Sequence, residues 1–431
     1  MTNFRLPPLA AALSLALTGA AQAAEGDPSI WSFSGFGTLA AVHSSEHEAD
    51  FLGSNRQSSG AGRTQATSFG PDSRLGGQIT AKFTPELSAV LQGVTQHQYD
   101  NSWTPQVEWA NVQYQFSPAL RVRVGRIAMP AFMVSETRLV GYANPSVRPP
   151  QEVYFINSIT SNDGVDATHV SHFGDAVNSL SGFYGRSTTK IPDDVTARAK
   201  TSWGINNTLE MGATSVRVSY VLLKIDIEAE SLRLLQDGLN GFGDAASAIP
   251  VPSIQAAGAQ AYALAQKYSL QGLSRQTLAI GVSHDTGHWF VAGEYVRLIA
   301  SAPFANANSG YVTAGYRVGA WTPYATLAAT RTPQPTEGGI STAGLPAQLA
   351  AGAAALNAGV SDLVVNIPKP TQQSITLGLR WDFMKNAAAK LQYEHIALGD
   401  NSYYGQLINR SPSYQAGGKL NLVSAAVDFV F

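Results

Sequence analysis

The side chains best suited to chemistry in this chain are cations within apolar stretches. Arg74 and Lys82 in 73–84, and Arg121 and Arg123 in 119–127, stand at alternate positions, and Arg126 follows at the edge of the next connection. In an extended strand, alternate side chains share one face, so such cations form a charged surface. Guanidinium and ammonium groups attract anions and filter ions by sign, which predicts the selection of solutes rather than a reaction.

A second group of charged residues belongs to the polar connection at about 128–162 and its end. This group consists of Glu136, Arg138, Arg148, Glu152 and Asp163. A basic wall that faces acidic groups would create a transverse field for passing solutes. Alternatively, the same residues form salt bridges that fix the connection to the wall, and both roles can coexist. Because acids and arginines are mixed, the pattern does not predict whether cations or anions are preferred.

Two histidine-containing stretches suggest other chemistry but do not support it. The stretch 43–50 holds histidines and acids that could ligate a metal, yet it lies in a Ser/Gly-rich loop without a rigid frame. His284, Asp285 and His288 span a tight turn, and no Gly-x-Ser-x-Gly element accompanies them. The sequence therefore predicts no catalytic residue, no metal site and no cofactor.

The composition restricts the class of protein. The 431 residues carry a net charge of −2 and only 13% charged residues, against about 25% in ordinary soluble domains. Mean hydropathy is −0.04, and the chain holds 40 glycines, 7 Trp, 16 Tyr and 17 Phe but no cysteine. These values exclude a disordered chain and a disulfide scaffold, and they disfavour a nucleic-acid partner.

The N-terminus has the features of a secretory signal peptide at 1–23. Arg5 precedes a short apolar stretch, and Ala21-Gln22-Ala23 forms a small-x-small cleavage pattern. Beyond it, no run of about 18 apolar residues predicts a spanning helix. We expect residues 24–431 to be exported as one domain.

The rest of the chain consists of short stretches with period-two alternation, and sixteen of them can be counted. They are 30–42, 73–84, 87–98, 106–116, 119–127, 163–173, 178–187, 197–208, 214–226, 274–284, 288–298, 310–318, 321–332, 372–383, 388–398 and 420–431. Long polar connections alternate with tight turns, so the two ends of the sheet face different environments. This pattern predicts an all-β fold, a 16-stranded antiparallel transmembrane β-barrel with long outer loops and short periplasmic turns. Ala-rich inserts at 254–267 and 343–359 predict short helices within two loops.

Two stretches carry a resemblance to a known family. The chain ends in Ala-Ala-Val-Asp-Phe-Val-Phe, with aromatics at Phe429 and Phe431, and 120–126 reads Leu-Arg-Val-Arg-Val-Gly-Arg. Together with the sixteen strands, these residues resemble the general, non-specific porins of Gram-negative outer membranes.

The resemblance implies a homotrimer in the outer membrane, in contact with lipid and lipopolysaccharide, that passes ions and small hydrophilic solutes by passive diffusion. It implies that 128–162 folds into the pore and sets the constriction, and that Phe429 and Phe431 form the insertion signal. Two alternatives stay open: a substrate-specific channel with a ladder of arginines, and, less favoured, a barrel enzyme.

Overall fold

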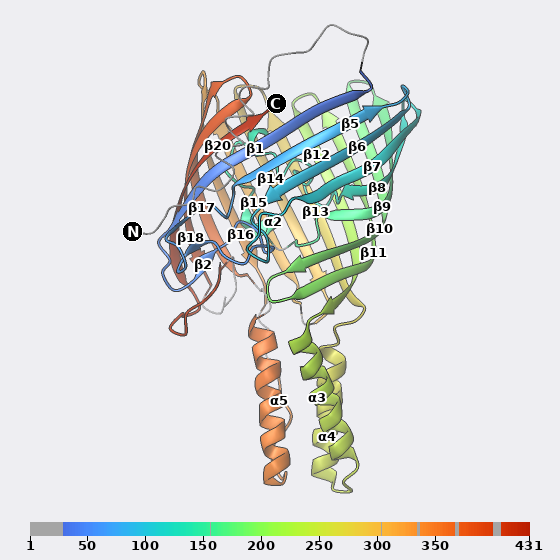
Figure 1. Ribbon diagram of the computed structural model, residues 1–431, viewed down its shortest axis with the longest axis vertical. Coiled ribbons are helices and arrows are strands. Elements are labelled where there is room, and N and C mark those ends of the chain that lie inside the picture. The colour runs from blue at the N-terminus through green and yellow to red at the C-terminus, as the bar shows by residue number, and fades with distance from the viewer. Residues whose placement is uncertain (1–28, 156, 303, 334–336, 367–369, 400–406) are drawn as a thin grey trace.

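The computed structural model describes residues 29–155, 157–302, 304–333, 337–366, 370–399 and 407–431, so the predicted signal peptide lies outside the described residues. Within them, sixteen long strands form one antiparallel sheet (Figure 1). These strands are β1 (Trp31–Ser44), β5 (Arg74–Lys82), β6 (Leu87–Gln96), β7 (Gln106–Ser117), β8 (Leu120–Ala128), β9 (Ser161–Phe173), β10 (Ala176–Ile191), β11 (Val195–Met211), β12 (Thr214–Glu228), β13 (Leu273–Asp285), β14 (Trp289–Ala300), β15 (Ala307–Tyr316), β16 (Trp321–Arg331), β17 (Gln372–Met384), β18 (Ala387–Leu398) and β20 (Gly418–Val430). Short strands β2 (Asp50–Phe51), β3 (Ala61–Gly62), β4 (Thr67–Ser68) and β19 (Leu407–Ile408) lie in the connections.

The sheet closes on itself through its first and last strands. β1 pairs with β20 from Phe36↔Val430 to Ser44↔Leu422, and on its other side with β5. Closure leaves no unpaired edge, which is the condition for a sheet to lie in lipid. The predicted all-β, 16-stranded antiparallel barrel is therefore confirmed.

The two ends of the barrel differ, and we call them the turn end and the loop end. Short turns such as 118–119 and 212–213 lie at the turn end, together with the start of β1 and the end of β20 (Figure 1). Long connections and helices lie at the loop end. At the turn end, Trp321 stacks on Trp381 with ring centroids 5.1 Å apart, as expected for an aromatic girdle.

The prediction of a long connection at 188–196 is wrong. β10 and β11 continue through it as a hairpin, and Ile191 pairs with Val195 around a turn in which Asp193 and Asp194 have positive φ. Both faces of this extension are rich in Ser, Thr and charged residues. The alternation that marks a half-buried strand disappears there, although the backbone pairing continues.

Three helices stand beyond the loop end: α3 (Glu230–Ser247), α4 (Pro252–Lys267) and α5 (Ala347–Asn366) (Figure 1). The insert at 254–267 is helical as predicted, whereas the second begins later than 343 and continues to 366. α3 was not predicted. The helices share an apolar core that includes Leu239, Phe242, Ala261 and Val360.

Among the described residues, no helix has both the length and the apolar character required to cross a membrane.

The inner face of the barrel is not polar throughout. On β10 to β14, Phe183, Val221, Leu223 and Val296 point inward and form one buried apolar cluster. Residues of the connection between β8 and β9, such as Ile159, complete that cluster. On β16 to β18 the inward positions are instead mostly polar, for example Thr326 and Gln392. Part of the lumen is thus filled by a hydrophobic core.

Candidate functional site

The connection between β8 and β9, which we call the inner loop (129–160, except 156), crosses the lumen. Its backbone is hydrogen-bonded to side chains from strands on different sides of the barrel. The amide of Met133 donates to Glu294 on β14 (3.0 Å), and the amide of Val147 donates to Gln392 on β18 (2.9 Å). On another side, Arg74 on β5 donates to the carbonyl of Arg138 (3.4 Å). The inner loop also contains η1 (Gly141–Ala143) and α2 (Gln151–Tyr154).

Arg148 is an almost completely buried charge of the inner loop. Its guanidinium lies between the carboxylates of Asp72, at 2.6 Å, and Glu394, and it also donates to Ser424 (2.7 Å). Burial by itself lowers the pKa of Arg148, but the two carboxylates more than reverse this effect and raise the pKa. Arg148 therefore remains a cation and joins the loop to β18, β20 and the segment before β5.

Two further cations hold the carbonyl groups of the inner loop. Lys390 on β18 donates to the carbonyls of Gly141 (2.8 Å) and Ser146 (2.9 Å), and it pairs with Asp428 at 2.8 Å. Arg380 on β17 donates to the carbonyl of Tyr142 (2.7 Å). Because each acceptor is a backbone atom, the contacts fix the path of the loop rather than one of its side chains.

The acids of the inner loop also have partners on the wall. Glu136 pairs with Arg217 on β12 at 2.9 Å, and Glu152 accepts a hydrogen bond from Gln372 on β17 at 2.9 Å. Glu152 is buried, and burial raises its pKa above the usual value. Glu136 therefore both anchors the inner loop and lines a cavity, whereas Glu152 is an anchor buried between the loop and the wall.

Three cavities follow one another along the inner loop. The loop-end chamber, about 80 Å³, is lined by Arg56, Asp72, Arg74, Arg138 and Arg148. The turn-end chamber, about 510 Å³, is lined by Arg121, Glu136, Glu210 and Arg217. Between them lies a neck of about 10 Å³, lined by Gln92, Glu108, Trp109, Glu136 and Arg138. The neck shares Arg138 with one chamber and Glu136 with the other, so the three cavities meet in series.

Arg138 is the cation at the neck. It donates to Glu108 on β7 at 3.2 Å and to Thr160 at 2.7 Å, while Arg56 approaches the same glutamate at 3.8 Å. Burial lowers the pKa of Arg138 to about 10, which still leaves it charged at neutral pH. The narrowest point is therefore bounded by an arginine from the inner loop and a glutamate from the wall.

The structure brings together only part of the predicted site. Arg74, Arg121, Glu136, Arg138 and Arg148 line the chambers or the neck. Lys82 does not join them: it is exposed at the turn end of β5, whereas Arg74 is at the loop end of that strand.

Two predicted cations form ion pairs across β8 and β9. Arg123 makes a forked contact with Asp166, with its Nε 3.0 and 3.1 Å from the two carboxylate oxygens. Arg126 pairs with Asp163 at 2.6 Å, but strand alternation puts this pair on the outer face, next to the exposed Val124. The expectation that Arg126 and Asp163 border the pore is corrected, because Arg126 is three residues from Arg123 and faces the other way.

Charged residues of this region that were not predicted include Asp72, Arg56, Arg217 and Glu210. Arg217 stands between Val216 and Val218, which is the same signal that identified Arg121, so the sequence could have indicated it. Asp72 and Arg56 lie in the connection between β1 and β5, where no periodicity assigns a direction to a side chain.

The fold just described is that of the outer-membrane porins. Solved structures that it matches include an anion-selective porin from Comamonas acidovorans, with a TM-score of 0.51 and 13% identity over 93% of this chain and 99% of that one. A Salmonella typhi OmpF in complex with daunomycin gives a TM-score of 0.51 at 12% identity, over 93% of this chain and 97% of the other. The channel DcaP of Acinetobacter baumannii gives 0.51 at 10% identity, with the same coverage. No family model matches the sequence, and no curated protein matches it.

Proposed function

We propose that this chain is a porin of the Gram-negative outer membrane, through which ions and small hydrophilic solutes diffuse passively. The observation that carries the proposal is the series of three cavities from the loop end to the turn end, lined mainly by polar and charged side chains. A passive pore requires only a continuous wet path with a narrowing, and no chemical step.

We infer that the route prefers anions. Its lining holds six arginines, Arg56, Arg74, Arg121, Arg138, Arg148 and Arg217, against the four carboxylates Asp72, Glu108, Glu136 and Glu210. A lining with a net positive charge raises the local concentration of anions and lowers that of cations. We also infer that the conductance is small, because the neck has a volume of about 10 Å³, which holds roughly one water molecule.

The outer surface supports contact with an anionic lipid leaflet such as lipopolysaccharide. Tyr184, Trp203 and Tyr295 are exposed aromatics near the middle of β10, β11 and β14, and Trp203 packs against Tyr220 of β12, with ring centroids 5.4 Å apart. Beyond them along the same strands, the outward positions become basic, with Arg186, Lys200, Lys224 and Arg297. Cations beside an aromatic girdle lie at the level of lipid phosphates. We place the chain in the outer membrane after export, with 1–23 as its signal.

Two further expectations come from the family resemblance: a homotrimer, and a C-terminal insertion signal at Phe429 and Phe431. The two rings stack against each other with centroids 6.3 Å apart, and they lie over Gly37 and Gly35 of β1. Light scattering of the purified protein, corrected for detergent, tests the trimer, and a monomeric mass would contradict it.

The alternative of a substrate-specific channel is favoured by one observation, the small neck. Such a channel would show a current that saturates as solute concentration rises. The enzyme alternative has no support in the geometry of the turn at 284–288. There His284 hydrogen-bonds Thr214 at 2.8 Å, and Asp285 forms an ion pair with Arg317 at 2.7 Å, rather than a nucleophile–base arrangement.

The proposal is tested by recording refolded protein in a planar bilayer under a tenfold KCl gradient. We expect small stepwise openings and a reversal potential whose sign corresponds to chloride. A barrel that is folded, as judged by circular dichroism, but gives no openings would refute the porin function. A reversal potential of the opposite sign would refute only the anion preference.

A further inference from the structure

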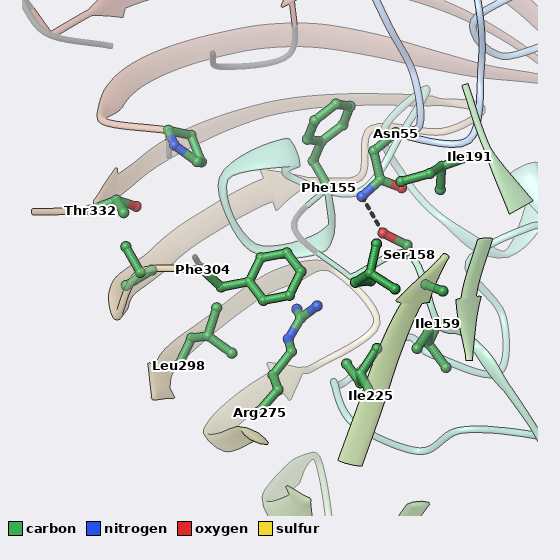
Figure 2. A pocket seen from close by; sticks show the side chains of 15 residues that line it. Asn55, Phe155, Ser158, Ile159, Ile191, Ile225, Arg275, Leu298, Phe304 and Thr332 are labelled. Carbon is green, nitrogen blue, oxygen red and sulfur yellow. Dashed lines mark hydrogen bonds between the residues drawn. The ribbon is translucent and has the colours of Figure 1, made fainter. Parts of the chain in front are cut away.

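A fourth cavity, at the loop end of the barrel, differs from the other three in being lined mainly by apolar atoms. It has a volume of about 130 Å³ and lies between the last turn of the inner loop and the ends of β10 to β16 (Figure 2). Most of its lining is apolar and includes Ile159, Ile225, Leu298 and Phe304. Phe155 belongs to both this cavity and the loop-end chamber, so its ring stands between the two spaces.

One charged side chain enters this apolar space. Arg275, on β13, has its guanidinium pointing into the cavity (Figure 2). Neutral polar groups are few at the margin, and two of them, Asn55 and Ser158, are hydrogen-bonded to each other at 2.8 Å (Figure 2). The cavity thus combines an apolar wall with a single cation, and a guanidinium has five N–H donors, enough to hold an added ligand besides its present contact.

We propose that this cavity binds a small hydrophobic carboxylate, with the carboxylate on the guanidinium of Arg275 and an aromatic ring or a short alkyl chain against Ile225, Leu298 and Phe304. Guanidinium and carboxylate form forked hydrogen bonds of matching geometry. The volume suits a ligand of this size, because an apolar cavity of about 150 Å³ in another protein accommodates benzene.

The lining also excludes other classes of ligand. An ammonium ion is repelled by Arg275, and a sugar would leave most of its hydroxyl groups without hydrogen bonds against the apolar wall. A very short acid such as acetate satisfies the guanidinium but covers little of the apolar lining. The combination therefore selects for size and charge together, as in sites where a few polar groups orient a mostly apolar ligand.

This site is independent of conduction through the neck, so it can be tested by binding alone. Calorimetry would titrate benzoate into the full chain in lipid nanodiscs, with empty nanodiscs as the reference. We expect one saturable site, at least about tenfold weaker in Arg275→Gln, because the charge-assisted hydrogen bonds are lost. Benzylammonium and acetate should not saturate at the same concentrations. No saturable binding of benzoate to the wild-type chain would overturn the proposal.

Two variants complete the test. Ala305→Phe fills the cavity from a lining position without removing a charge, and it should abolish binding while the barrel stays folded. Arg331→Gln removes a matched arginine from the exposed outer face of β16, and it should bind benzoate as the wild type does. Equal affinity in wild type, Arg275→Gln and Ala305→Phe would place benzoate elsewhere and contradict the assignment.

Discussion

Arg148 Nη2 lies 2.6 Å from Asp72 Oδ2, and the side chains of both residues are almost completely buried, at 2% and 1% exposure. Glu394 approaches the same guanidinium from β18. One cation of the inner loop is thus held between two carboxylates of the barrel. This contact is one of those that join the inner loop to the wall of the barrel.

Replacing Arg148 by methionine should release the inner loop. The change removes the cation between the buried carboxylates of Asp72 and Glu394 and leaves Arg74, 3.7 Å from Asp72, as a more distant partner. Breaking a buried pair in this way costs about 3–5 kcal/mol. We expect a lower unfolding temperature and single-channel currents with frequent partial closures. Arg331→Met, at the exposed end of β16, serves as the control and should change neither property. Steady currents and unaltered thermal unfolding in Arg148→Met would show that the loop is held by other contacts.

Replacing Arg138 by alanine should widen the neck and weaken its selectivity. Arg138 occupies the narrowest point of the route, beside Glu108. The net charge of the lining falls from two to one, so the reversal potential under a salt gradient should fall to roughly half while conductance rises. Lys82→Ala, which removes a cation from the turn end of the same lumen, should leave conductance nearly unchanged. If both variants behave alike, the neck is not the constriction.

The buried carboxylate of Glu152 should make the stability of the protein depend on pH. Its pKa is raised in the folded protein by burial, so the native state binds this proton more tightly than the unfolded state. The contribution of Glu152 to stability is therefore present at low pH and is lost as the pH rises through the folded pKa. Glu152→Gln should accordingly be more stable than the wild type at neutral pH and equal to it in acid.

Thermal unfolding at several pH values measures this effect. Glu136→Gln provides the contrast, because Glu136 forms an ion pair with Arg217 and its neutralisation should destabilise the protein at neutral pH. The same sign of effect in the two variants at neutral pH would contradict the assignment of Glu152 as a buried acid whose pKa is raised by burial.

The C-terminal aromatics should assist closure of the barrel. The ring of Phe429 covers Gly37, where a Cβ atom would overlap it, and Phe431 covers Gly35 in the same way. Phe429→Ala removes this packing between β20 and β1, and a loss of about 1 kcal/mol would lower the folded-to-unfolded ratio roughly fivefold. Refolding into vesicles, followed by electrophoretic mobility without heating, measures the folded fraction. Phe173→Ala, an exposed aromatic at another turn, should refold normally.

The barrel could be predicted from the sequence because its signal is local. In strands such as β5 and β17, successive side chains point alternately to the outer and the inner face of the barrel. The face of each residue therefore follows from its position in the alternating pattern. The prediction was wrong where a segment does not alternate between apolar and polar residues. The β10–β11 hairpin has polar residues on both faces, and α3 carries leucines at helical spacing inside what was expected to be a loop.

Among the charged residues of the site, only those on strands could be assigned to the lumen from the sequence, because strand alternation determines the face of the sheet on which they lie. Arg121 was placed in the lumen by alternation, whereas the partners of Arg148 come from segments far apart in the sequence: Asp72, Glu394 and Ser424. The path of the inner loop determines these contacts, and no periodicity describes that path. The apolar cluster inside the lumen was missed for a related reason, because inward-facing Val221 and Leu223 look the same as lipid-facing residues in the sequence.

The central claim is that solutes pass between the inner loop and the wall at the neck, rather than past the apolar cluster. The chain has no cysteine, so one introduced thiol is a unique target. Thr160→Cys places it where the loop-end chamber meets the neck, and Leu223→Cys places it in the apolar cluster. A positively charged methanethiosulfonate reagent should abolish most of the current of Thr160→Cys and leave that of Leu223→Cys unchanged. Block of Leu223→Cys with no effect on Thr160→Cys would contradict the account.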